Sequence, residues 1–138
     1  MIHEKSCGAV IYAVRERETV WLVERMRHGH VSLCKGHVEA GETEHDTARR
    51  EIWEETRLTV TFQDGFREHI EYSPYPSCLK EVIFFLARAD GMDAVPQEEE
   101  VASIAFLPFD EAVAALTYED DKRVLTAARD FLAGRGRV

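Results

Sequence analysis

The sequence is poor in the residues that mark disulfide-bonded and metal-finger proteins. Its 138 residues include three cysteines and four prolines. Cys7, Cys34 and Cys78 are odd in number and far apart, which excludes both a disulfide framework and the paired spacing of a zinc finger. We therefore expect three reduced thiols in a protein of the cytoplasm.

Long apolar runs are also missing. The longest, Val82–Ala87, is far shorter than the roughly 18 residues that indicate a membrane span. The first residues include Glu4 and Lys5 and continue into a strand-like pattern, unlike a secretory signal. We expect no contact with a membrane.

Positive charge is scarce, with 17 Lys and Arg against 26 Asp and Glu and a net charge of -9. A nucleic-acid surface needs a basic stripe, so this balance argues against nucleic acid as a partner. An anionic ligand must instead be bound locally or through metal ions. No repeat or linker divides the chain, which predicts a single domain over residues 1–138, whereas the oligomeric state stays open.

Strands and helices are both predicted. Segments rich in β-branched and aromatic residues predict strands at Ser6–Val14, Thr19–Glu24, Thr59–Phe62, Phe66–Tyr72, Glu81–Leu86 and Ser103–Leu107. Helical spacing and a capping box at Thr43 and Asp46 predict helices at Glu44–Arg57, at Asp110–Leu116 and in the last segment, through Val124, Leu125, Ala128, Phe131 and Leu132. This mixture predicts an α/β (α+β) fold with helices packed on the faces of a sheet.

Three carboxylates share one face of the first predicted helix. Glu51, Glu54 and Glu55 stand at i, i+3 and i+4, within a sector of roughly 100°. Like charges at this spacing destabilise a helix by about 0.2 to 0.5 kcal/mol, and a hard divalent cation such as Mg²⁺ or Mn²⁺ reverses that penalty. The alternative is a solvated acidic face. The apolar residues of the adjacent sector, expected to pack on the sheet, are Ala48, Ile52 and Trp53.

A cationic stretch precedes this helix. Residues 25–38 contain Arg25, Arg27, Lys35 and three histidines without an acidic residue. Lys35 beside Gly36 offers a point charge next to accessible backbone N–H groups, as a phosphate requires. Metal-binding carboxylates facing phosphate-binding cations predict metal-assisted hydrolysis of a phosphoanhydride.

The run GHVEAGETEHDTARREIWEETRL, residues 36–58, resembles the Nudix box, G-x5-E-x7-R-E-U-x-E-E-x-G-U, where U is a bulky aliphatic residue. The resemblance implies an α/β/α sandwich with a mixed central sheet and a catalytic helix after a phosphate- and metal-binding loop. It implies an enzyme that hydrolyses a nucleoside diphosphate linked to another moiety, by water attack at phosphorus with more than one Mg²⁺ or Mn²⁺ ion.

Residue roles follow from the resemblance by position. Glu51, Glu54 and Glu55 match the metal ligands, with the carbonyl of Gly36 as a further ligand. Arg50 matches an arginine that orients the glutamates, and Glu42 one that braces the junction between loop and helix. The general base varies in the family and stays open. Glu98, Glu99 and Glu100 are downstream candidates for a base or a further ligand, of which Glu100 is preferred, against a solvated acidic loop.

The sequence departs from the family pattern in three places. Arg57 replaces the glycine that leaves the helix in a left-handed conformation, at a cost of roughly 1 kcal/mol if that conformation is kept. Cys34 and Val31 stand where many relatives have proline and tryptophan. Neighbouring cations could make Cys34 a reactive thiol, although lone cysteines are more often inert.

Further stretches resemble the dinucleoside polyphosphate hydrolases of the family, at residues 7–12, 35–39, 106–109 and 121–125. This resemblance implies asymmetrical cleavage of diadenosine tetraphosphate. Tyr75 lies near the position of a base-stacking tyrosine, with a simple surface turn as the alternative. Lys35, His37 and Arg25 are the other candidates for substrate binding. Nucleoside triphosphates including oxidised ones, ADP-ribose, the triphosphate end of an RNA, and a non-catalytic nucleotide sensor stay open as alternatives.

Overall fold

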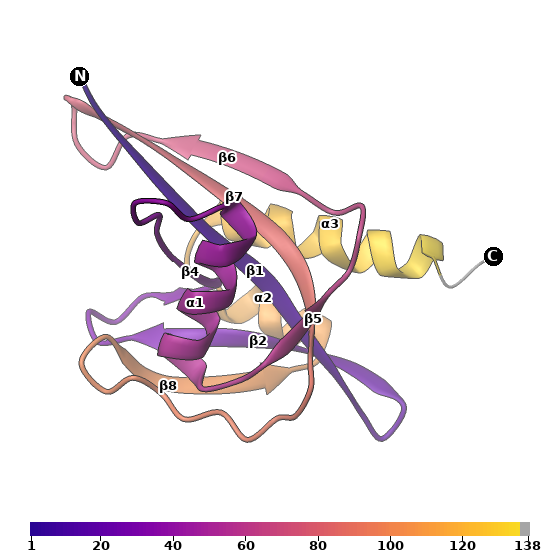
Figure 1. Cartoon of the computed structure of the whole chain (residues 1–138). Coiled ribbons are helices and arrows are strands. Elements are labelled where there is room, and N and C mark those ends of the chain that lie inside the picture. Colours follow the sequence, from indigo (N-terminus) through magenta and orange to yellow (C-terminus); the bar gives the residue numbers. More distant parts are fainter. Residues whose placement is uncertain (136–138) are drawn as a thin grey trace.

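The computed structural model describes residues 1–135, which form eight strands and three helices (Figure 1). The elements are β1 (Ile2–Arg15), β2 (Glu18–Met26), β3 (Val31–Ser32), β4 (Cys34–His37), α1 (Glu44–Thr56), β5 (Val60–Phe62), β6 (Glu68–Tyr72), β7 (Cys78–Ala89), β8 (Val101–Leu107), α2 (Phe109–Ala115) and α3 (Glu119–Arg135).

The sheet is mixed, and β1 lies at its centre. β1 pairs in parallel with β7 and antiparallel with β2 and β4. β3 and β8 pair antiparallel with β2, and β5 and β6 pair antiparallel with β7. The long β1–β7 pair therefore carries the rest of the sheet on either side.

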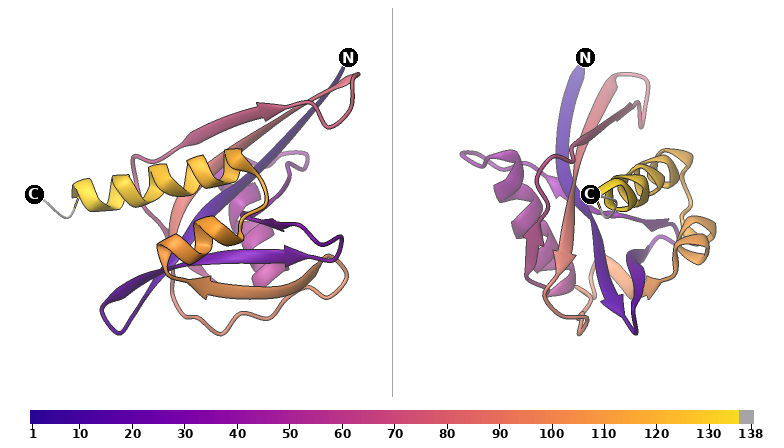
Figure 2. Two further views of the ribbon diagram at one scale, coloured as in Figure 1. Left: turned by 180° about the vertical axis from the view of Figure 1, so that it is seen from behind. Right: turned by 90° about the vertical axis from the view of Figure 1, so that its right-hand side faces the viewer.

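Both faces of the sheet are buried under helices. Figure 2 shows α1 on one side of the sheet and α2 and α3 on the other. Successive side chains of a strand point to opposite faces, so β7 sends Val82, Phe84 and Leu86 toward α2 and α3, and Ile83, Phe85 and Ala87 toward α1. The α/β/α sandwich with a mixed sheet is thus confirmed, as is the doubly buried strand.

Helix α1 begins as expected. The Thr43 hydroxyl accepts from the Asp46 N–H and the Asp46 carboxylate accepts from the Thr43 N–H, both at 3.1 Å. Ala48 and Ile52 are fully buried against the sheet. Trp53 was expected beside them, which is wrong: its side chain is 48% exposed, because position 53 is rotated by about 100° from position 52.

The cationic stretch contains more regular structure than expected. β2 extends to Met26, and β3 and β4 follow within it. β4 forms because its backbone pairs with Ser6–Ala9 of β1, where a Cβ at Gly8 would overlap with the carbonyl oxygen of Cys34. A short charged strand of this kind has no alternation for sequence reasoning to detect, because partner and position come from the tertiary structure.

The three cysteines are free and buried, as expected. None of the helices in residues 1–135 combines the length and the apolar character needed to cross a membrane.

Arg57 ends α1 in the left-handed region, with φ 59° and ψ 20°. This is the conformation expected from the glycine that the family pattern has at this position. We expect Arg57→Gly to raise the free energy of unfolding by about 1 kcal/mol, which raises the melting temperature by roughly 3 to 5 °C. Arg57→Ala is the matched control, since both variants remove the guanidinium that lies 5.3 Å from the Trp53 ring centroid but only glycine removes the strained Cβ. Equal melting temperatures for the two variants would contradict this account.

Candidate functional site

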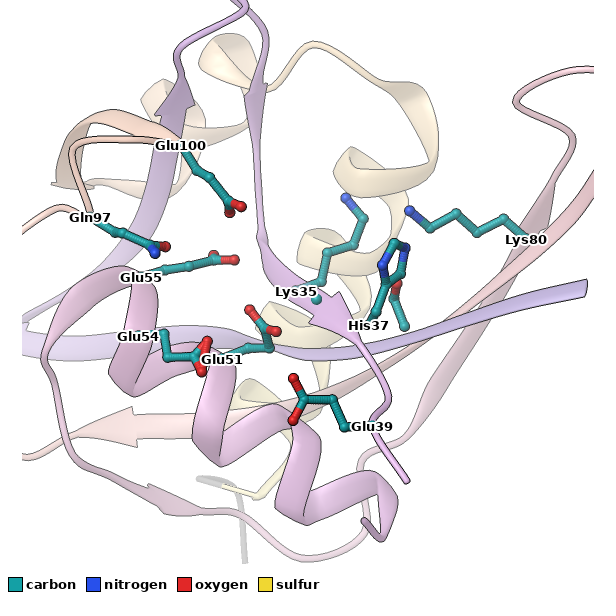
Figure 3. Close-up of a pocket in the computed structure, with 11 residues that line it drawn as sticks. Lys35, His37, Glu39, Glu51, Glu54, Glu55, Lys80, Gln97 and Glu100 are labelled. Carbon is teal, nitrogen blue, oxygen red and sulfur yellow. The ribbon is translucent and has the colours of Figure 1, made fainter. Parts of the chain in front are cut away.

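A polar cavity of about 380 Å³ lies between α1, β4 and the segment before β8. Figure 3 shows Lys35, His37 and Lys80 on one side of it and Glu51, Glu54, Glu55 and Glu100 on the other. The residues that line it are Ser6, Lys35, Gly36, His37, Glu39, Glu51, Glu54, Glu55, Lys80, Gln97 and Glu100. The fold therefore brings together seven of the residues that the sequence singled out, and adds Ser6, Glu39, Lys80 and Gln97, which were not predicted as site residues.

Arg50 connects the glutamates of α1 with the preceding loop. Its guanidinium donates to Glu42 Oε2 at 2.6 Å and to Glu51 Oε1 at 2.7 Å, and it reaches Glu54 Oε2 at 3.2 Å. The same group donates to the carbonyl oxygen of His37 at 2.8 Å. One cation therefore sets the positions of two cavity carboxylates and of the end of β4.

Glu42 completes this connection from the loop side. Its Oε1 accepts from the Glu39 N–H at 2.9 Å and from the Thr47 hydroxyl at 2.8 Å. Hydrogen bonding from Arg50 is the largest of the effects that lower the pKa of Glu42 to about 2. Glu42 is therefore ionised throughout the physiological range.

Gly36 lets the backbone approach the helix closely. A Cβ at this position would overlap with the carboxylate of Glu51. Any other residue would displace the Glu51 carboxylate, so this carboxylate lies against the backbone of β4 only because position 36 has no side chain.

The three glutamates of α1 lie in different environments. Glu55 follows Ala48 by seven residues, which places it about 20° from the buried stripe of the helix, and it is only 3% exposed. Its Oε1 accepts a hydrogen bond from the Cys34 thiol, with 3.3 Å between sulfur and oxygen. Burial and the nearby Glu24 raise the pKa of Glu55 far above that of an ordinary carboxyl group.

Cys34 is not the reactive thiol that neighbouring cations would create. Burial raises its pKa well above the ordinary value, and the neighbouring Glu24 and Glu55 act in the same direction. The groups that shift its pKa are therefore buried carboxyl groups and not the cations that lie near it in the sequence.

Glu100 and Gln97 reach the cavity because the segment before β8 is tied to the rest of the site. The Arg27 N–H donates to the Glu100 carbonyl at 2.9 Å, and the Gln97 N–H donates to the Glu55 carbonyl at 3.2 Å. Glu100 lines the cavity, whereas Glu98 and Glu99 do not. Glu51, Glu54, Glu55 and Glu100 thus line one cavity together with Gly36, and they offer oxygen atoms, the ligands that Mg²⁺ and Mn²⁺ prefer.

A second cavity, of about 690 Å³, adjoins the first. Lys35 and Lys80 line both. Tyr72 from the end of β6, Tyr118 from the segment before α3, and His30 provide rings there, and the buried Asp121 provides a carboxyl group. No local pattern in the sequence predicts a site at these residues, since they come from distant segments without a shared motif.

Two of the substrate-binding candidates lie elsewhere. Tyr75 is 45% exposed in the turn between β6 and β7 and lines neither cavity. Arg25 is also exposed and lines neither cavity.

Comparisons with known proteins agree with this geometry. The family model of the NUDIX domain matches residues 4–128. The chain is similar to the 8-oxo-(d)GTP phosphatase of Mycolicibacterium smegmatis, at 39% identity over 77% of this chain and 32% of that protein, so it spans about a third of that relative. It is also similar to the asymmetrical bis(5'-nucleosyl)-tetraphosphatase of Sus scrofa, at 31% identity over 93% of this chain and 95% of that protein. A crystal structure of a C. elegans Ap4A hydrolase binary complex superimposes with a TM-score of 0.87 at 26% identity, covering 95% of this chain and 98% of that one.

The contacts of Glu42 predict how the fold responds to acid. Its pKa falls from an ordinary 4.5 to about 2 on folding, so its stabilisation is complete above pH 4.5 and is lost as the pH falls toward 2. We expect Glu42→Gln to lower the melting temperature at pH 7 and to flatten its decline between pH 4.5 and 2. The exposed Glu99→Gln is the control and should follow the wild type, and a Glu42→Gln curve that does so too would contradict this role.

Proposed function

Because the chain belongs to the Nudix domain family, we propose that it is a metal-dependent pyrophosphohydrolase that cleaves diadenosine tetraphosphate asymmetrically into ATP and AMP. The observation that carries this proposal is the pair of adjoining cavities. One cavity offers carboxylates and the other offers tyrosine rings, and Lys35 and Lys80 belong to both.

This arrangement favours a base joined to a chain of phosphates. A purine between or against Tyr72 and Tyr118 in the second cavity would gain stacking energy of about 1 to 3 kcal/mol. From there a phosphate chain reaches the glutamates only past Lys35 and Lys80, whose ammonium groups neutralise its charge. A substrate that extends through both cavities is therefore a nucleotide with a phosphate chain rather than a nucleoside.

Glu51, Glu54, Glu55, Glu100 and the Gly36 carbonyl are the groups that would hold Mg²⁺ or Mn²⁺. When bound, such ions neutralise charge on the phosphoryl oxygens and lower the pKa of a bound water.

The side chains of the protein bind the substrate, position the glutamates and accept a proton. His37 and the two lysines bind and orient the phosphates, and Arg50 keeps Glu51 and Glu54 in place through the hydrogen bonds described above. Glu100 enters the cavity from the side opposite Lys35 (Figure 3) and is the preferred group to accept the proton of the attacking water.

The similar proteins support two different substrates. Asymmetrical cleavage of diadenosine tetraphosphate is supported by the Sus scrofa relative, whose length the chain covers at 95%, and by the C. elegans structure. The 8-oxo-(d)GTP phosphatase, at 39% identity, supports an oxidised nucleoside triphosphate as the second candidate. The Asp121 carboxyl in the second cavity is consistent with that choice, since a carboxyl oxygen can accept a hydrogen bond from an N–H group of a guanine ring.

The deciding experiment incubates the protein with Mg²⁺ and each substrate separately and resolves the products by chromatography. The panel contains diadenosine tetraphosphate, 8-oxo-dGTP, ADP-ribose and ordinary nucleoside triphosphates. ATP plus AMP, formed faster than any other product, is the expected result. Faster cleavage of 8-oxo-dGTP would replace the substrate but keep the chemistry, and nucleotide binding without turnover under any divalent cation would favour a sensor.

Removing a metal-binding carboxylate should abolish turnover. We expect Glu54→Gln and Glu55→Gln each to lower kcat by about 10²-fold or more, because an amide keeps the size of the carboxylate but loses its charge. Glu99→Gln, on the same acidic segment as Glu100 but outside the cavity, should keep the wild-type kcat. Full magnesium-dependent turnover in both cavity variants would make the metal assignment wrong.

Three tyrosines can be compared for base stacking. We expect Tyr72→Ala and Tyr118→Ala each to raise KM for diadenosine tetraphosphate by about 10-fold or more, with a smaller effect on kcat. Tyr75→Ala tests the position that the sequence suggested and should change KM little, since its ring lines neither cavity. The opposite ranking would return the stacking role to Tyr75.

A further inference from the structure

Three potential metal ligands meet in the interior behind the polar cavity. They are Glu24 on β2, Cys34 on β4 and Glu55 on α1, and all three are buried. One ligand atom from each lies within 4.8 Å of the other two, and the Cys34 sulfur is 3.3 Å from Glu55 Oε1. Three elements that are far apart in the sequence therefore converge on one small volume.

Glu24 is the residue that the rest of the fold leaves unexplained. It follows Val20 and Leu22 on the face of β2 that packs toward α1, where a strand would carry another apolar residue. It is 1% exposed, and neither of its carboxylate oxygens has a hydrogen-bond partner within residues 1–135. Burying a carboxyl group without a partner costs several kcal/mol unless it is neutralised or bound.

The charge of this cluster is not balanced by an ion pair within residues 1–135. Within the described residues, no lysine, arginine or histidine forms an ion pair with Glu24 or Glu55. A divalent cation bound between the three groups would provide one positive charge that all of them share.

We propose that Glu24, Cys34 and Glu55 form a second metal site, which binds a thiophilic divalent cation of the zinc class. It is distinct from the oxygen-only Mg²⁺ ligands of the cavity. Sulfur is a soft ligand that Mg²⁺ avoids, whereas Zn²⁺ accepts thiolate and carboxylate together. The carboxylate of Glu55 is common to both sites, so the two metals would lie on either side of it.

The spacing of the ligands fits a zinc ion. With bonds of roughly 2.3 Å to sulfur and 2.0 Å to oxygen, a tetrahedral ion holds its sulfur and oxygen ligands about 3.5 Å apart. The Cys34–Glu55 pair, at 3.3 Å, already has this separation. Glu24, at no more than 4.8 Å, reaches a tetrahedral separation with a shift of at most roughly 1.5 Å, and the fourth position is left for water.

An ion can reach the cluster from the solvent-filled cavity, because Glu55 belongs to the wall of that cavity. Once bound, it would tie β2 and β4 to α1. The site would thereby fix Glu55 and the strand that carries Lys35 and Gly36. This buried metal site requires no hydrolytic activity, so it can be tested independently of the function proposed above.

The test is a titration of the full-length, metal-free protein with CoCl₂, followed by absorbance. Cobalt(II) replaces zinc and produces a near-ultraviolet charge-transfer band only when a thiolate is bound to it. We expect one such band, saturating at one cobalt per chain and removed by one equivalent of Zn²⁺ but not by excess Mg²⁺. Absence of the band in the folded wild type would overturn the proposal.

Single variants assign the ligands. Cys34→Ser should abolish the band, and Glu24→Gln should raise the Kd for cobalt by about tenfold or more. Cys7→Ser and Cys78→Ser are matched controls, since both thiols are buried but lie outside the cluster, and both variants should keep the band. Loss of the band in either control, or its survival in Cys34→Ser, would overturn the assignment. If circular dichroism shows Cys34→Ser to be unfolded, the wild-type titration and Glu24→Gln still decide.

Glu54→Gln separates this inference from the proposed function. Glu54 belongs to the cavity but not to the buried cluster, so this variant should lose magnesium-dependent turnover and keep the cobalt band. Zinc should also raise the melting temperature of the wild type more than that of Glu24→Gln. An equal rise in both proteins would place the zinc on the cavity carboxylates and contradict the buried site.

Discussion

The guanidinium group of Arg50 is the contact on which the geometry of the cavity depends. Glu51 and Glu54 carry like charges on adjacent positions of one helix face, and Arg50 holds both within hydrogen-bond distance. It also binds Glu42 and the carbonyl of His37, so the loop and the helix cannot move independently. Hydrogen bonding to Glu42 raises the pKa of Arg50 further, which keeps this cation charged at every pH at which the protein is folded.

The rotation of α1 gives its glutamates different properties. Glu54 lies at the edge of the cavity and is partly exposed, whereas Glu55 points along the buried stripe that Ala48 and Ile52 define. A carboxyl group in the interior has a raised pKa and a strong need for a cation. Glu24 lies behind Glu55, so the need for a cation continues from the cavity into the hydrophobic layer beneath it.

Local patterns in the sequence predicted much of the fold. The capping box at Thr43 and Asp46, the two-sided apolar run of β7 and the helical spacing of the last segment all form as expected. The glutamate spacing and the Lys35–Gly36 pair identified five cavity residues, because each pattern depends on neighbours within a few positions. The exposure of Trp53 was missed, since helical angle alone does not say where a helix meets a sheet.

What the sequence determined by itself was the identity and local geometry of the chemical groups: three carboxylates on one helix face, a glycine before them, and an arginine between. The tertiary structure alone decided which distant residues join them. It formed β4 by pairing with β1, brought Lys80, Tyr72 and Tyr118 to the adjoining cavities, left Tyr75 outside, and buried Glu24 beside Cys34 and Glu55. The reason is physical. Periodicity and capping act over one or two turns of chain, whereas sheet register and helix docking depend on contacts between segments that no local pattern connects.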